Sequence, residues 1–195
     1  VYMNYDDFPN DVKKGERILV DDGKLIFEII STNGVNEVKT KVIQGGFLKS
    51  KKGVNLPNTK VSLPALTKKD KKDALFALDQ GVDWIALSFV RYAKDLKKLQ
   101  KLIKNNSKYK VPIIAKIEKP EGVANIKKIV QYCDGIMVAR GDLGVEVPAE
   151  EVPLIQKKLV LIAKEARIPV IIATQMMETM IDSLTPTRAE VNDVA

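Results

Sequence analysis

Two charged side chains stand at the end of one apolar run and could do chemistry together. The run IIAKIE places Lys116 and Glu118 one residue apart. Successive residues of a strand point to opposite faces, so these two side chains would project on the same side. The pair is either a plain ion pair or part of a site. Pro120 and Gly122 follow and predict a tight exit, which favours a site at the rim of a sheet.

The next two apolar runs also end in polar residues. GIMVA is followed by Arg140, Gly141, Asp142 and, after one leucine, a second glycine. Glycine lets a ligand approach the backbone closely, and free N–H groups there can hold an anion. A simple loop with a capping aspartate is the structural alternative. The run VIIAT ends in Thr174, which offers either a hydroxyl at the same rim or a helix cap.

The acidic members of this set indicate a hard metal ion. Glu118 and Asp142 are carboxylates with no histidine available, which suits Mg²⁺ or Mn²⁺. Combined with Lys116, Arg140 and Thr174, such a cation could hold a small, doubly anionic substrate. The set could stabilise either an enolate or a transferring phosphoryl group, and spacing alone leaves both open.

Composition narrows the chemistry further. The 195 residues contain no histidine and one cysteine, Cys133. This composition excludes catalysis by a histidine base, histidine-ligated zinc or haem, and an intrachain disulfide. No apolar run approaches the ~20 residues that span a bilayer, and no leader is evident, so we expect a cytoplasmic protein without membrane contact.

The site residues need a parallel sheet to bring them together. From about residue 56 onward, near-continuous apolar runs alternate with helical patterns, which is typical of a parallel α/β sheet. Because ligands gather at the carboxyl ends of such strands, the three runs should form one site. The expected strands are 83–89, 111–117, 135–139 and 169–174, and the expected helices are 67–80, 94–106, 121–131, 149–167 and one beginning near Thr187.

The first part of the chain, up to about residue 55, has a different pattern of apolar and polar residues. Segments that alternate apolar and polar residues are separated by Asp22-Gly23 and Asn33-Gly34, two strong turn dipeptides. We expect a small antiparallel β module, joined to the rest by a strap over 49–57. Four β/α units are too few for an eight-stranded barrel of ~250 residues. The start at Val1 and the end within an expected helix suggest an internal excerpt.

Four segments together resemble the pyruvate kinase family. They are SKKGVNLP, IAKIEKPEG, MVARGDLGVEVPAEEVPLIQK and the final run from VIIATQMMETMI to PTRAEVNDVA. The resemblance covers essentially the whole chain in order and without a gap. It implies an α/β fold: a partial (β/α)8 TIM barrel over 56–195, preceded over 1–55 by part of a small β-barrel lid domain that closes on the nucleotide.

The resemblance also implies an activity and a role for each site residue. The family transfers the phosphoryl group of phosphoenolpyruvate to ADP and protonates the enolate to give pyruvate in glycolysis. Lys116 matches the lysine that stabilises the transferring group and the enolate oxygen, and Thr174 matches the threonine beside the protonated carbon. The substrate-binding set is Lys116, Gly141, Asp142 and Thr174. Glu118 and Asp142 match the Mg²⁺ ligands, Arg140 matches a catalytic residue that shapes its loop, and Lys52 matches a nucleotide-binding lid lysine.

Other parts of the family's machinery are not in this sequence. The resemblance implies a K⁺ ion whose site belongs to the missing amino-terminal region, together with an arginine for the substrate phosphate. We therefore expect the 195-residue chain alone to have little or no kinase activity. The resemblance further implies that the parent protein is a homotetramer, so we expect a homo-oligomer whose partners are phosphoenolpyruvate and ADP.

Two other functions compete with this one. A Mg²⁺-dependent pyruvate-type aldolase or lyase would share the metal and the enolate but would not need Lys52. A nucleic-acid-binding module would rest on the formal charge of +7. The lysines of segments such as 94–106 interleave with leucines at helical spacing and lack interleaved aromatic residues, so we expect no nucleic acid partner.

Overall fold

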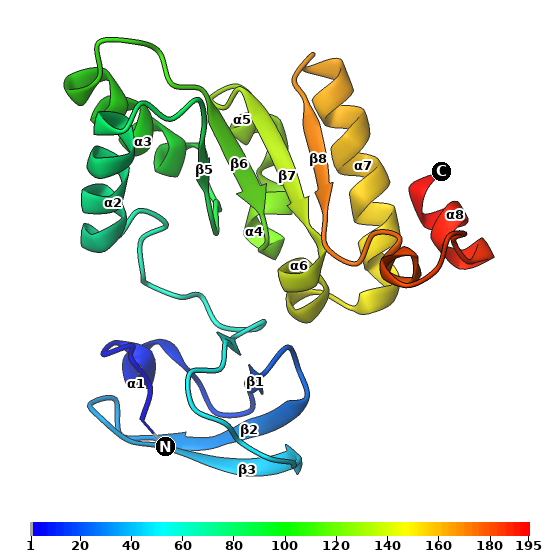
Figure 1. The fold of residues 1–195 in the computed structure, drawn as a ribbon. Helices are drawn as coiled ribbons and strands as arrows, with labels where there is room; N and C mark the ends of the chain where they lie inside the picture. The colour runs from blue at the N-terminus through cyan, green and yellow to red at the C-terminus, as the bar shows by residue number, and fades with distance from the viewer. Residues whose placement is uncertain (1) are drawn as a thin grey trace. The chain divides into compact units, whose positions relative to one another are not determined.

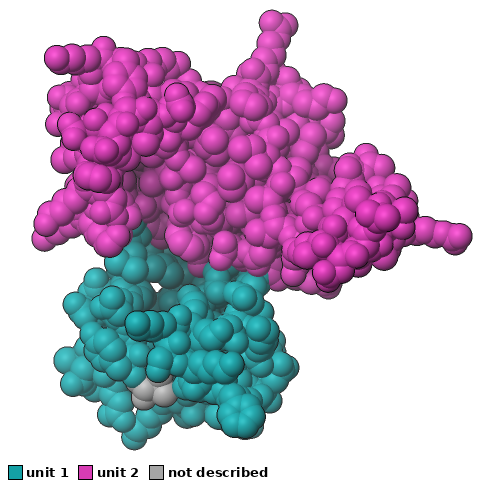
Figure 2. All heavy atoms as spheres, in the orientation of Figure 1, with its two compact units in different colours: residues 1–64, 145–147 teal, residues 65–144, 148–195 magenta. Residues whose placement is uncertain are grey.

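The computed structural model describes residues 2–195, which form two compact units. The first comprises the described residues up to Pro64 together with 145–147, and the second comprises residues 65–144 and 148–195 (Figure 2). No helix in the described part of the chain is long and apolar enough to cross a membrane.

The first unit is built on an antiparallel sheet, as the alternating pattern predicts. Its strands have the order β3-β2-β1-β4 (Figure 1). Asp21, Asp22 and Gly23 all have positive φ in the turn between β1 and β2, and Gly34 has φ 68° in the turn that follows β2. The strand bounds are β1 Arg17–Val20, β2 Leu25–Thr32, β3 Val38–Gln44 and β4 Val54–Asn55, and a short helix, α1 Phe8–Asp11, precedes them.

The boundary between the units lies later than the expected 55/56. Leu56 is buried in the core of the first unit, with an exposed fraction of 5%. Two hydrogen bonds then hold the following residues to the same unit: Thr59 Oγ1 donates to Glu16, and the Ser62 backbone N–H donates to Asp11. The chain therefore leaves this unit only after Pro64.

The second unit contains the predicted parallel sheet, with strand order β5-β6-β7-β8. Figure 1 shows the four arrows ending at one edge. The strands are β5 Ile85–Leu87, β6 Ile113–Ile117, β7 Gly135–Ala139 and β8 Val170–Ala173. The helices are α2 Lys68–Asp79, α3 Ala93–Asn106, α4 Pro120–Ala124, α5 Ile126–Ile129, α6 Arg140–Glu146, α7 Val152–Glu165 and α8 Arg188–Val194, with 3₁₀ turns η1 Ala149–Glu151 and η2 Glu178–Ile181.

Local sequence signals explain several of these helices. Thr67 and Asp70 form a reciprocal capping box at the start of α2, and Thr187 and Glu190 form another at the start of α8. The basic helix α3 buries Leu96, Leu99 and other apolar residues of one face and leaves its lysines outside. The positive charge of α3 therefore belongs to its solvent-exposed face, as expected for an amphipathic helix.

Three expected elements differ in the structure. The helix expected over 121–131 is two short helices that meet at Asn125, whose side chain donates to two backbone carbonyls. The helix expected over 149–167 begins as a 3₁₀ turn. The segment after β7, for which no helix was expected and a simple loop was the structural alternative, is the helix α6, which begins directly at Arg140.

The exit from β6 depends on a glycine at position 122. A Cβ added to Gly122 would lie 2.5 Å from the carbonyl oxygen of Val90, and backbone cannot move away cheaply. We expect Gly122→Ala to lower the free energy of unfolding by about 2 kcal/mol through overpacking. Chemical denaturation measures the change. Gly53→Ala, where a Cβ would meet no atom within 4 Å, is the control, and equal stability of the two variants would contradict the prediction.

Candidate active site

The end of β6 carries the first cluster of the site. Lys116 Nζ lies 2.8 Å from Glu118 Oε1, as their alternate positions predict. Lys116 also donates to the hydroxyl of Ser88, 3.0 Å away, just beyond β5. Glu118 is only 1% exposed, whereas the lysine side chain is 26% exposed. The ammonium group is thus held by two fixed oxygens while part of the side chain still reaches solvent.

A strained residue after β5 supplies the second contact to the buried carboxylate. Phe89 has φ 53°, a left-handed conformation that is uncommon for a bulky residue. In this conformation its backbone N–H donates to Glu118 Oε2 at 2.7 Å. Each carboxylate oxygen of Glu118 therefore has a partner. Neither Ser88 nor Phe89 was among the residues predicted for the site, although their place directly after an apolar strand was the available signal.

The second cluster joins the ends of β7 and β8. The backbone N–H of Gly141 donates to Thr174 Oγ1 at 2.9 Å, which fixes the position of the hydroxyl. A Cβ on Gly141 would lie 3.3 Å from the same oxygen, so a side chain here would crowd the threonine. Asp142, half-buried in the first turn of α6, has no side-chain partner among residues 2–195.

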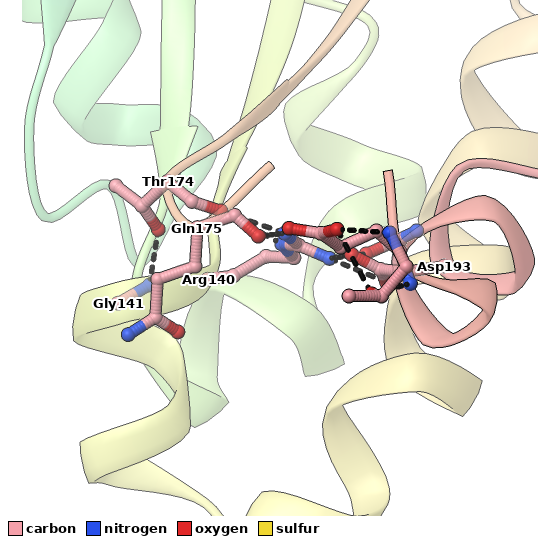
Figure 3. A network of polar contacts seen from close by, with 8 residues as sticks. Arg140, Gly141, Thr174, Gln175 and Asp193 are labelled. Atoms are coloured by element: carbon pink, nitrogen blue, oxygen red, sulfur yellow. Dashed lines mark hydrogen bonds and ion pairs between the residues drawn. The ribbon is translucent and has the colours of Figure 1, made fainter. Parts of the chain in front are cut away.

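Arg140 lies at the centre of a polar network at this edge (Figure 3). Its Nη2 donates to the carbonyl oxygens of Thr174 and Gln175, at 2.6 and 2.9 Å. Its Nη1 lies 2.6 Å from both carboxylate oxygens of Asp193 on α8. The guanidinium group therefore binds the loop after β8 rather than facing solvent, and its side chain is 10% exposed.

The residues of the two clusters could hold a divalent cation. Glu118 and Asp142 stand at the carboxyl ends of neighbouring strands, β6 and β7, and both offer oxygen atoms. No group of three or more cysteine, aspartate and glutamate side chains suited to a metal occurs in the described part of the chain. One or two carboxylates with water and substrate oxygens is the usual environment of Mg²⁺, so the donor set fits that ion.

Lys52, expected to bind nucleotide, belongs to the other unit. Its Nζ lies 2.9 Å from Asp21 Oδ1. A hydrogen bond with Asp21 raises the pKa of Lys52, and the same bond lowers the pKa of Asp21. The lysine therefore stays charged at neutral pH, which a phosphate-binding residue requires.

Two other features of the second unit carry no chemistry of this kind. Burial raises the pKa of the Cys133 thiol to about 11, so this thiol is protonated at neutral pH and is a poor nucleophile. An apolar hollow lies at the opposite, amino-terminal ends of the strands. It is lined by Trp84, Ile114, Gly135, Ile136, Pro169 and Ile171.

Comparison with known proteins places this geometry in a family. The model of the pyruvate kinase barrel domain matches residues 1–195. The chain is 51% identical over 194 residues to pyruvate kinase 2 of Synechocystis, and 50% identical to the pyruvate kinases of Corynebacterium glutamicum and Geobacillus stearothermophilus over 195 and 196 residues. These alignments cover 99 or 100% of this chain but only 33, 41 and 33% of the three relatives. With a match of this extent, and with the resembling segments lying at the ends of three neighbouring strands, the chain belongs to the pyruvate kinase family.

Proposed function

We propose that the protein containing this chain is a pyruvate kinase that makes pyruvate and ATP from phosphoenolpyruvate and ADP. The observation that carries the proposal is the lysine–glutamate pair at the end of β6, in a chain that matches the family over its whole length. In the reaction, the bond between phosphorus and the enol oxygen breaks and a bond to the terminal phosphate oxygen of ADP forms. The enolate then takes a proton on its methylene carbon.

The chain's own residues divide this work. Lys116, a compact charge held by two oxygens, faces the transferring phosphoryl group and the enolate oxygen and lowers the energy of the charge that develops there. Asp142 binds the substrate carboxylate through its backbone N–H, next to Gly141, whose own N–H is used to hold Thr174. Thr174, fixed by Gly141, lies beside the carbon that is protonated and orients the water that delivers the proton.

The cations of the reaction are part of the proposal. Glu118 and Asp142 would hold Mg²⁺ or Mn²⁺, which when bound supplies positive charge that offsets the charge of the phosphate and the enolate. A K⁺ ion would bind residues outside this chain. A homo-oligomeric state of the full-length protein is likewise proposed on the family likeness.

The test is pyruvate release from phosphoenolpyruvate and Mg²⁺, with and without ADP. The full-length gene product and the 195-residue chain are assayed in parallel. We expect release that depends on ADP from the full-length protein and little or none from the chain alone. Absence of release from the full-length protein would contradict the proposed function. Turnover by the chain near that of the full-length protein would contradict the need for the other segments.

The role of Lys52 distinguishes a kinase from an aldolase or lyase on a similar barrel, because an aldolase or lyase binds no nucleotide and needs no lysine for its phosphates. We expect Lys52→Ala to raise the KM for ADP about tenfold, because one charge-assisted contact to phosphate is lost, and to leave the KM for phosphoenolpyruvate unchanged. Steady-state kinetics of the full-length protein measures both constants.

The matched control for this variant is Lys24→Ala. Lys24 lies 3.6 Å from the same carboxylate of Asp21 but is 71% exposed. We expect it to leave both KM values unchanged. An unaltered KM for ADP in the Lys52 variant would remove the support for a nucleotide-binding lid.

A further inference from the structure

Every nitrogen of the Arg140 guanidinium group has a protein acceptor. Nε lies 3.3 Å from the carbonyl oxygen of Thr174, Nη2 donates to the carbonyl oxygens of Thr174 and Gln175, and Nη1 contacts Asp193 and, at 3.4 Å, Gln156. Arginine has five N–H donors in a fixed fork, and these contacts use all of them. Arg140 therefore acts on the protein rather than on a ligand.

The segment that Arg140 binds is strained. Thr174, Gln175 and Met177 have φ values of 71°, 52° and 54°. Non-glycine residues persist in this region only where their surroundings determine the conformation, and a β-branched threonine is a clear outlier there. The carbonyl groups of the first two residues are the ones that Arg140 binds, so the arginine holds the strained turn from which the Thr174 hydroxyl projects.

Asp193 holds the arginine in turn. Both of its carboxylate oxygens lie 2.6 Å from Nη1, opposite the loop carbonyls (Figure 3). The helix that carries it is anchored separately, because Glu190 accepts hydrogen bonds from the backbone N–H and hydroxyl of Thr179. Asp193 thus pairs with a charge that is 10% exposed, from a helix that is itself fixed to the same loop.

We propose that Asp193 is a positioning residue for proton transfer, which acts through Arg140 to set the Thr174 hydroxyl. This inference rests on the proposed function, because Thr174 has its role in protonation of the enolate. When Asp193 loses its negative charge, Nη1 of Arg140 has only neutral partners. The guanidinium group can then move away from the carbonyl oxygens of Thr174 and Gln175. The left-handed turn at 174 and 175 then relaxes, and the hydroxyl leaves its place beside Gly141.

The test is Asp193→Asn in the full-length gene product. A misplaced catalytic group costs on the order of 100-fold for a displacement of about 1 Å, so we expect kcat to fall about 10- to 100-fold. The KM values for phosphoenolpyruvate and ADP should stay near those of the wild type. Exchange of the methyl protons of pyruvate with D₂O, followed by NMR, isolates the proton transfer and should slow by at least the same factor.

Two further variants separate positioning from stability. Asp193→Glu keeps the charge and should recover most of the exchange rate. In a Thr174→Val background, Asp193→Asn should have little additional effect, because residues that act through one group are not additive. Asp182→Asn is the control, since this exposed carboxylate has no side-chain contact in the described part of the chain, and it should behave as the wild type.

The outcomes distinguish this inference from the proposed function. If the wild type shows no ADP-dependent pyruvate release, the proposed function fails. If the wild type is active and Asp193→Asn exchanges protons at the wild-type rate, the positioning role is wrong. An equal loss in the wild-type and Thr174→Val backgrounds, or unfolding of Asp193→Asn at the assay temperature, would also overturn it.

Discussion

Replacing Lys116 with methionine should lower kcat of the full-length protein at least about 1,000-fold, the upper range for loss of one preorganised charged donor. The lysine Nζ is held at 2.8 Å from Glu118 and 3.0 Å from Ser88, so its charge is in place before the reaction begins. Methionine has a similar length and no charge. The loss should fall on kcat more than on KM, because the charge it stabilises is largest in the transition state.

The same substitution removes the ion pair of a buried carboxylate, so stability must be measured beside activity. Lys116→Arg separates the two effects. It keeps a positive charge beside Glu118, but spreads that charge over a planar group that cannot replace a compact ammonium. We expect Lys116→Arg to unfold at the wild-type denaturant concentration and still lose most of its activity.

The control for both variants is Lys127→Met, on the exposed face of α5. It should leave kcat and stability unchanged. A Lys116→Met variant that folds normally and retains a tenth of the wild-type kcat would show that this lysine does not stabilise the transferring group.

Local patterns were enough to predict the elements that position the site. The near-continuous apolar runs IIAKI, GIMVA and VIIA form β6, β7 and β8 at nearly the expected residues. Strands β6 and β7 bury most of their apolar side chains, whereas β8 lies at the edge of the sheet and leaves Ile171 40% exposed. The alternation of Lys116 and Glu118 predicted their contact because the period of a strand fixes which side chains share a face. The expected helix starts at Thr67 and near Thr187 are confirmed, and each is stabilised by a capping box between residues three positions apart.

Contacts between distant residues could not be predicted in this way. Arg140 and Asp193 are 53 positions apart, and Phe89 reaches Glu118 across 29. The left-handed conformation of Phe89 and Thr174 contradicts their local preferences, because tertiary hydrogen bonds determine it. The helical form of α6 was missed because two glycines in seven residues are typical of a loop.

Replacing Glu118 with glutamine should raise the Mg²⁺ concentration for half-maximal activity by about 10- to 100-fold or more. Loss of a group that only supports a metal ligand already lowers metal affinity by about 10- to 100-fold. Glutamine keeps the volume of this 1%-exposed side chain, and its carbonyl oxygen still accepts from Phe89. The change is thus mainly one of charge. Lys116 is then left with Ser88 as its hydrogen-bond acceptor, so kcat at saturating Mg²⁺ should also fall.

Binding of Mn²⁺ without substrates, measured by electron paramagnetic resonance, tests the ligand role apart from catalysis. The variant should bind Mn²⁺ more weakly by a similar factor. Glu121→Gln is the matched control, because Glu121 lies three residues away in the first turn of α4, and its side chain has no contact in the described part of the chain.

If Glu118→Gln lowers kcat but leaves Mn²⁺ binding unchanged, then Glu118 serves to orient Lys116 and the cation depends on Asp142 alone within this chain. In that case Glu118 would not be a metal ligand, and the buried glutamate would serve only to hold the ammonium group of Lys116 in place.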